Sequence, residues 1–436
     1  MKAQNPRQKA LVSWNSKQKD VVDRYVSYLS QILNIGQNGE VSTSEIAKLE
    51  IFLKILAQNI NIAGISDLET KRNLIFQAAF LRFGKYETKN ISTFSEALTA
   101  ETDQHLNRPF KKFWILLPLN VYPGAKFDRF RSFSILSKRL LIRNWNYIEK
   151  HFDYTTFMTD VNRKLPIFKI PLHSYFVPIL VAVDAQDDQK AFDEANRSFD
   201  LFRSLLNLQF TFGMSSLQFG GYPRPLAKIL PPPIYGVFDG TRKYLQFYYN
   251  IVNNYEYTQN DIADDKIIRC RKLASTLKST KSEDDIMSLN VEVLEKYGEA
   301  LDTSEWRLSF LILWQILESI TLQSNEEFSM KTVVNRINIL FGQNQLNKDL
   351  LSALYQTRNL LVHKGYFPSE QGLREVNLLK SIVEPSMQSI LAQAKYLPTK
   401  NSLNKFYEHA TDNNADLNER ARIISLIRQH RAKHKN

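Results

Sequence analysis

The sequence predicts a mainly α-helical protein with a central α+β domain and a C-terminal helical bundle. Three observations support this fold class: helical spacing of apolar residues near the N-terminus, β-like runs punctuated by Pro and Gly in the middle, and amphipathic stretches after residue 261. The chain has 436 residues, which is too long for one typical domain. We therefore expect four regions: an N-terminal helical region 1–109, an α+β domain of unknown role 110–260, a helical bundle 261–400 and a basic helical tail 401–436.

The first region is expected to contain three helices. Apolar residues recur at helical spacing from Val21 to Leu33, and a second run follows Thr43-Ser44-Glu45, which is a plausible helix cap. A third candidate helix covers residues 68–83. The stretch 87–107 is polar, and we interpret it as a loop.

The central region changes character near Phe110. Residues 113–121 and 175–183 are β-like runs, the second broken by Pro178, and residues 190–208 show a clear helical spacing. Residues 132–142 fit either a strand or a helix. The segment 220–233 is rich in Gly and Pro and predicts irregular connections, after which residues 245–249 predict the last strand.

The C-terminal part is helical throughout. Asp284-Asp285 opens one predicted helix and Ser304-Glu305 opens a strongly amphipathic one. The other expected helices cover residues 330–341 (ended by Gly342), 347–365 (with Gly365 as C-cap), 373–396 (kinked near Pro385) and 417–433.

Composition restricts the class of protein. The single cysteine, Cys270, excludes a disulfide within the chain and a Cys-rich metal site. The N-terminus is polar, and no apolar run approaches the ~20 residues of a membrane-spanning helix, so we expect a cytoplasmic protein with no membrane contact. The formal charge of +12 favours polyanions such as nucleic acid as partners, although ordinary surface charge explains it equally well.

One motif carries chemistry. The helix predicted over 347–365 ends in Tyr355-Gln-Thr-Arg358-Asn359-Leu-Leu-Val-His363-Lys-Gly365. An amphipathic helix with Trp314 and Glu318 precedes it, and a closing helix follows it. With these features, residues 300–395 resemble the HEPN family, whose mark is an Arg followed by a polar residue and by a His four to six positions later.

The resemblance implies a function. It is closest to the HEPN domains of bacterial defence proteins, and implies a metal-independent endoribonuclease without cofactors, acting on RNA as an antiviral defence or toxin effector. His363 would be the acid-base residue, Arg358 the phosphate clamp and Asn359 their support, with Glu318 and Lys364 as candidate supporting residues. HEPN domains commonly complete their site with a second subunit, which implies a homodimer, and the N-terminal two-thirds would sense a trigger or regulate the nuclease.

The residue types suit that chemistry. Cleavage without a metal requires a base that takes the proton of the RNA 2′-hydroxyl, and His is the side chain that does so near neutral pH. An Arg fork offers donors that match the phosphoryl oxygens on which charge develops.

Helix geometry adds a restriction. Five residues along a regular helix turn through ~140°, so Arg358 and His363 do not share a face. Either the helix loosens near Gly365, or a second subunit completes the site.

Other interpretations remain open. A His at a helix end is favoured by the helix dipole, and an Arg inside a helix often covers apolar surface with its stem. The alternative to a nuclease is therefore a non-catalytic HEPN-like protein that binds RNA or nucleotide, or only dimerises. Glu318 fits a pair with Arg358 as well as a surface position.

The remaining candidates favour structural roles. His105, His151 and His173 lack ligand-like neighbours, and Asp184, Asp187 and Asp188 fit a solvated turn better than a cation loop. Tyrosines near the last strand and the basic tail are weaker candidates for stacking on bases or touching RNA, namely Tyr248, Tyr249, Tyr255, Tyr257, Arg420, Arg422, Arg428, Arg431, Lys433 and Lys435.

Overall fold

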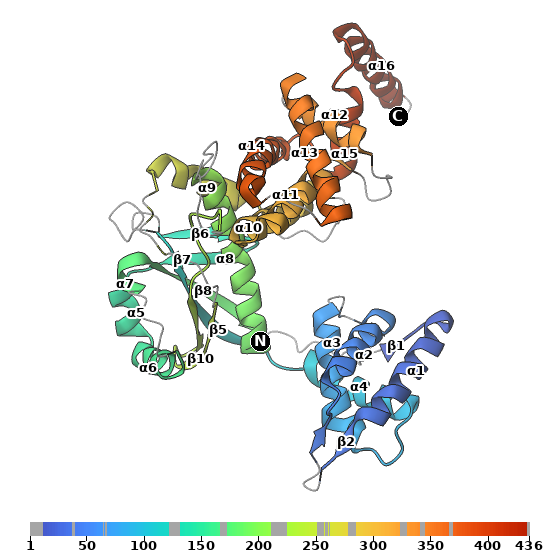
Figure 1. Ribbon diagram of the computed structural model, residues 1–436, viewed down its shortest axis with the longest axis vertical. Coiled ribbons are helices and arrows are strands. Elements are labelled where there is room, and N and C mark those ends of the chain that lie inside the picture. Colours follow the sequence, from blue (N-terminus) through green and yellow to red (C-terminus); the bar gives the residue numbers. More distant parts are fainter. Residues whose placement is uncertain are drawn as a thin grey trace. The chain divides into compact units, whose positions relative to one another are not determined.

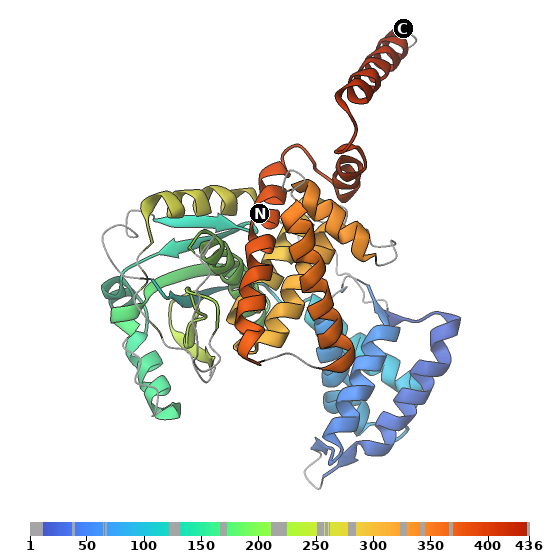
Figure 2. The ribbon, with the colours of Figure 1, turned by 45° about the horizontal axis from the view of Figure 1, so that its top comes forward.

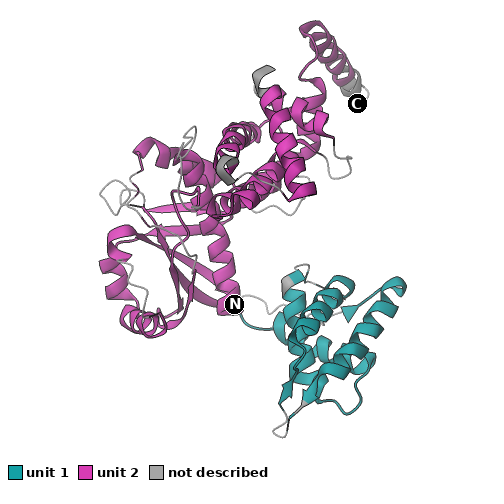
Figure 3. Cartoon of the chain, in the orientation of Figure 1, with its two compact units in different colours: residues 1–110 teal, residues 111–436 magenta. Residues whose placement is uncertain are grey.

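The computed structural model describes residues 12–36, 40–63, 65, 68–121, 131–165, 172–210, 225–250, 257, 260, 262–277, 285–322, 329–340, 345–365 and 369–433. The chain forms two compact units, residues 1–110 and residues 111–436 (Figure 3). In the described part, helices predominate and one antiparallel sheet has six strands, which confirms a mixed, helix-rich fold class. Apart from Phe110, the expected regions 110–260, 261–400 and 401–436 all fall within the second unit.

The first unit is a ring of helices around one apolar core. Helix α1 packs on α2, α2 on α3, α3 on α4, and α4 on α1. The core contains fully buried Val22, Leu29, Leu56 and Phe94. The elements are β1 (Val12–Ser13), α1 (Ser16–Ile32), β2 (Asn34–Ile35), β3 (Val41–Ser42), α2 (Ile46–Asn59), β4 (Asn61–Ile62), α3 (Leu68–Gln77), a π-helix (Ala78–Arg82), a 3₁₀ turn (Phe83–Lys85) and α4 (Ile91–Leu106).

The loop predicted over 87–107 is wrong, because residues 91–106 form α4. Asn90 caps this helix in a reciprocal pair of hydrogen bonds with Thr93. Its inner face buries Phe94, Leu98 and also Glu101, whose carboxylate accepts from Arg82 Nε at 2.5 Å. Residues 87–107 look polar in the sequence because the buried face of α4 includes the charged residue Glu101. Its partner, Arg82, lies in another element.

The cap predicted at Thr43 to Glu45 differs in detail. Helix α2 begins at Ile46 as expected, but the Glu45 side chain makes no capping hydrogen bond. The Thr43 hydroxyl accepts the backbone N–H of Glu45 at 3.1 Å, so it stabilises the turn before the helix.

The second unit begins with an antiparallel sheet whose strands lie in the order β10-β9-β5-β8-β7-β6 (Figure 1). The β-like runs around residues 113–121 and 175–183 are confirmed as β5 and β8, which pair along their full length. Residues 132–142 form a hairpin, which settles the choice between strand and helix. The strands are β5 (Lys111–Leu119), β6 (Ser132–Ile135), β7 (Lys138–Ile142), β8 (Val177–Ala185), β9 (Ile234–Asp239) and β10 (Tyr244–Tyr249).

Helices cover both faces of this sheet (Figure 1). On one face, Ile115 and Val181 are buried against α8 (Asp188–Phe210), as the alternation of side chains along a strand requires. On the other face, Leu116 and Leu180 pack with the helices α5 (Trp145–His151), α6 (Tyr154–Lys164) and α7 (Leu172–Tyr175).

The C-terminal helices continue the core that begins under the sheet (Figure 2). Helix α10 packs on both α8 and α11, and α11 in turn contacts α12, α13 and α14. Helix α11 is therefore the centre of the bundle, with Phe310, Leu313 and Trp314 buried. The helices are α9 (Asp264–Thr276), α10 (Ile286–Asp302), α11 (Trp306–Thr321), α12 (Met330–Leu340), α13 (Gln345–Lys364), α14 (Ser369–Gln393), α15 (Lys400–His409) and α16 (Asn414–Lys433).

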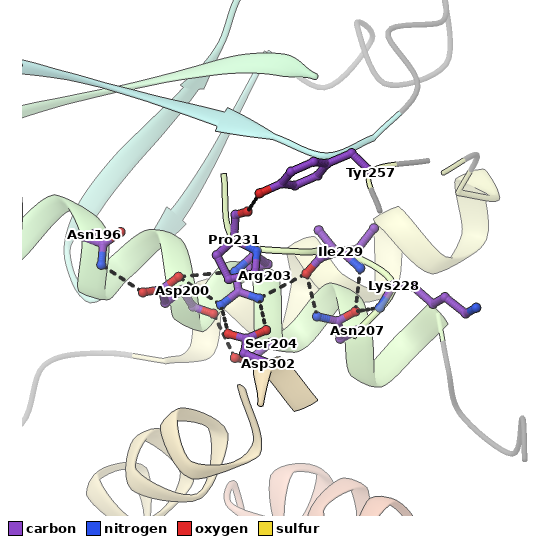
Figure 4. A network of polar contacts seen from close by, with 10 residues as sticks. All are labelled: Asn196, Asp200, Arg203, Ser204, Asn207, Lys228, Ile229, Pro231, Tyr257 and Asp302. Carbon is purple, nitrogen blue, oxygen red and sulfur yellow. Dashed lines mark hydrogen bonds and ion pairs between the residues drawn. The ribbon is translucent and has the colours of Figure 1, made fainter. Parts of the chain in front are cut away.

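A buried ion pair joins helix α8, which packs on the sheet, to helix α10 of the C-terminal bundle (Figure 4). Arg203 of α8 is 2% exposed and donates to both carboxylate oxygens of Asp302, the last residue of α10, at 2.7 and 2.5 Å. It also donates to the carbonyl oxygen of Ile229 at 3.0 Å. Burial alone would lower the pKa of Arg203, but the charges of Asp302 and Asp200 raise it above its ordinary value, so the guanidinium stays charged.

Close packing between α8 and α10 supports the same contact. A Cβ atom at Gly298 of α10 would lie 2.3 Å from the Ser204 hydroxyl oxygen, so glycine lets the two helices approach. Asn207, one turn after Arg203, accepts the backbone N–H groups of Lys228 and Ile229 at 3.0 and 2.9 Å. The segment before β9 is thereby tied to α8.

We expect Asp302→Ala to lower the free energy of unfolding by about 3 kcal/mol, because it leaves a buried guanidinium without its main counter-charge. Denaturant unfolding of the purified protein measures this. A matched control is Asp265→Ala, which removes an exposed pair with Arg269 and should cost less than ~1 kcal/mol. A similar loss in both variants would contradict the special role of the buried pair.

Candidate functional site

The helix that carries the motif is α13, and it ends where the sequence predicts. Gly365 has a φ of +61° and its N–H donates to the Leu361 carbonyl oxygen at 3.0 Å, which confirms it as the C-cap. Leu351, Leu354 and Leu361 form the buried face of the helix. This face packs on α11, α12 and α14.

Arg358 lies beside that buried face and is held from α11. Its Nη2 atom is 3.7 Å from Glu318 Oε1, and the two side chains are 24% and 22% exposed. The same Glu318 oxygen accepts from Trp314 Nε1 at 2.8 Å. The expected pair between Glu318 and Arg358 is therefore present, and an indole fixes the carboxylate that orients the guanidinium.

Asn359 extends the same group of side chains. Its Oδ1 accepts from Arg358 Nη1 at 3.4 Å, which is long for a hydrogen bond. Tyr355, one turn before, packs on Trp314 with ring centroids 5.8 Å apart. The guanidinium of Arg358 thus has the polar neighbours Glu318 and Asn359, and Tyr355 of the same helix packs on the indole that fixes Glu318.

His363 does not join this group within one chain. The α-helix continues regularly through Lys364, so it does not loosen between Arg358 and His363, and the two residues keep the ~140° separation of a regular helix. The imidazole is exposed, and in the described part of the chain it has no hydrogen bond or ion pair. Lys364 is also exposed. Both lie in the last turn, where the helix dipole favours positive charge.

His173 and His151 pack against aromatic rings. The His173 ring stacks on Trp145 at a centroid distance of 4.9 Å, and its Nε2 lies 3.0 Å from the Tyr154 hydroxyl. His151 lies beside Tyr147, with ring centroids 4.5 Å apart. Burial and the Glu149 charge raise the pKa of Tyr154 to about 12, so it stays protonated near neutral pH.

Of the three aspartates predicted to lie in a turn, only Asp187 does so, whereas Asp184 is exposed within β8 and Asp188 is the first residue of α8. Asp187 accepts the Lys190 backbone N–H at 2.8 Å, which stabilises the first turn of α8, and Asp188 accepts from Gln246 at 2.5 Å. Among the residues the structure describes, no group of three His, Cys, Asp or Glu side chains is placed to hold a metal.

The tyrosines and the tail differ in exposure. Tyr248 stacks on Phe192 with centroids 4.1 Å apart, and Tyr257 donates to the Pro231 carbonyl at 2.8 Å, so both are engaged within the fold. Tyr249 is 54% exposed. The described side chains of α16, residues 414–428, are all exposed, whereas Tyr255, His434 and Lys435 lie outside the described residues.

Within the described ranges, no helix has both the length and the apolar character needed to cross a membrane.

Comparison with family models, curated proteins and solved structures found no match to this chain. Sequence reasoning also missed one cluster, in which Arg336, Lys348 and Tyr407 line a shared cavity. Their positions are far apart in the chain, and no local pattern connects them.

We expect Gly365→Ala to lower the free energy of unfolding by roughly 1 kcal/mol, because the φ of +61° is unfavourable for a residue with a Cβ. Apart from its chain neighbours, no atom of the described residues lies within 4 Å of the added methyl group, so the expected cost comes from the backbone. Thermal denaturation measures the change. Gly365→Asn is the control and should cost less, since Asn tolerates this conformation; an equal loss would contradict the explanation.

Proposed function

We propose that the chain is a metal-independent endoribonuclease of HEPN type whose reacting groups are Arg358, Asn359 and His363. One observation carries the proposal: a guanidinium paired with Glu318, whose carboxylate Trp314 fixes, is still about one-quarter exposed and lies on the same helix as an exposed imidazole. A cation fixed before substrate arrives stabilises a developing phosphoryl charge without reorganising.

The reaction follows from these groups. His363 accepts the proton of the RNA 2′-hydroxyl, and the 2′-oxygen attacks the adjacent phosphorus. The bond to the 5′-oxygen breaks, that oxygen takes a proton, and a 2′,3′-cyclic phosphate remains. Arg358 contacts the non-bridging oxygens through its fork, with Asn359 beside it.

A second copy of the chain completes the site in this proposal. Arg358 and His363 point about 140° apart on a helix that stays regular, so one phosphate does not reach both within a single chain. Two α13 helices related by a twofold axis bring the Arg358 of one copy to the His363 of the other.

One observation favours a second candidate, a bundle that dimerises without cutting RNA. Leu360 and Val362 are 42% and 50% exposed beside the motif, which suits an apolar contact between copies. The Glu318 carboxylate near Arg358 also neutralises part of the charge that a phosphate would use.

Cleavage of total RNA in the presence of a chelator tests the nuclease. We expect the unaltered protein to cut RNA, and His363→Ala to reduce the rate by about 10²- to 10⁴-fold, since it removes the general base. His151→Ala is the matched control, because His151 is also an exposed helix-terminal histidine, and it should leave the rate unchanged. No cleavage by any of the three proteins, combined with a dimeric mass in solution, would favour the second candidate.

Mixing two inactive variants tests the shared site. Arg358→Ala and His363→Ala are refolded or co-expressed together, so half of the dimers are mixed. Each mixed dimer contains one intact pair, one Arg358 facing one His363, and we expect about a quarter of the unaltered rate to return. If both groups act within one chain, the mixture stays inactive, which would contradict the dimeric arrangement.

A further inference from the structure

A cavity of about 480 Å³ lies among α12, the first turn of α13 and α15, away from the motif at the other end of α13. Its volume is in the range of pockets that bind small organic molecules. Arg336 and Asn335 of α12, Lys348 of α13, and Tyr407 and Glu408 of α15 contribute to its lining. Neither Arg358 nor His363 reaches it, so it is a separate candidate site.

Arg336 is held in position by the end of α11. Its Nη1 donates to the carbonyl oxygen of Thr321, and its guanidinium carbon lies 5.6 Å from the centroid of the Tyr407 ring. Tyr407 is 4% exposed and its hydroxyl donates to the Ile320 carbonyl at 3.4 Å. Because the cation is already ordered, a ligand that binds it loses less conformational entropy of the protein.

Lys348 brings a second cation to the same cavity from another helix. It is half-buried, and in the part of the chain that the structure describes its ammonium group has no ion-pair partner. Among the lining side chains that the structure describes, Glu408 supplies the one carboxylate, so these side chains carry a net positive charge. An anionic group between Arg336 and Lys348 would contact two cations, and Arg and Lys are the usual pair of side chains for a phosphate.

We propose that this cavity binds a small sugar phosphate. The phosphate group contacts Arg336 and Lys348, and the hydroxyl groups donate to Glu408 and pair with the Asn335 amide. The cavity is much larger than a phosphate ion, so the sugar fills the remaining space and adds specificity. This inference does not rest on the RNA chemistry proposed for α13.

Titration calorimetry on the full chain tests the proposal, with glucose 6-phosphate and ribose 5-phosphate as probes and with inorganic phosphate and glucose beside them. We expect at least one sugar phosphate to bind with a Kd below about 1 mM. Inorganic phosphate should bind at least about tenfold more weakly and glucose not detectably, since each lacks half of the contacts.

The Lys348→Met variant should weaken sugar-phosphate binding by about tenfold to a hundredfold, because it keeps the stem and removes the charge. Lys331→Met is the matched control: Lys331 is exposed on α12 and does not line the cavity, so this variant should bind like the unaltered protein. The proposal is overturned by the absence of binding for both sugar phosphates, by equal affinity for inorganic phosphate, or by unchanged affinity in Lys348→Met. None of these results alters the RNA cleavage assay.

Discussion

The second unit depends on the buried contact between Arg203 and Asp302. A guanidinium in an apolar interior is costly unless its donors are met, and here Asp302, Asp200 and the Ile229 carbonyl meet them. The two hydrogen bonds from Arg203 to the Asp302 carboxylate also require one relative position of the two helices, whereas apolar side chains can pack in several positions. The pair therefore sets where α10 lies on α8, and through α10 it sets the position of α11 at the bundle centre.

The C-terminal bundle contains two further ion pairs, one buried and one partly exposed to solvent. Lys380 and Glu384 of α14 are 5% and 1% exposed, and Tyr297 of α10 donates to Glu384 at 2.5 Å. That pair is closed to solvent and serves to register α14 on α10. The pair of Arg358 and Glu318 is built alike, with an indole as the third partner, but about one-quarter of each side chain reaches solvent. Exposure is what separates a candidate site from a structural pair here.

Sequence periodicity succeeded where one face of an element is uniformly apolar. Strands β5 and β8 are of this kind, and the buried residues of helix α11 are apolar apart from Ser309 and Thr321. It failed for α4, whose buried face includes Glu101 and Thr102. Glu101 is buried because Arg82 neutralises it, and that partner is not visible from the local pattern. The spacing of Phe94 and Leu98 after the capping residue Asn90 was the signal that the sequence did contain.

The sequence by itself determined the local geometry of the motif: a regular helix separates Arg358 from His363 by about 140°, and Gly365 ends it. These features follow from bonds between residues within one or two turns. Only the tertiary structure decided that Glu318 faces Arg358, and that Arg336, Lys348 and Tyr407 surround one cavity. Contacts of this kind depend on how whole helices pack against one another. That packing is determined by many side chains that are distant in the chain, and no local sequence period encodes it.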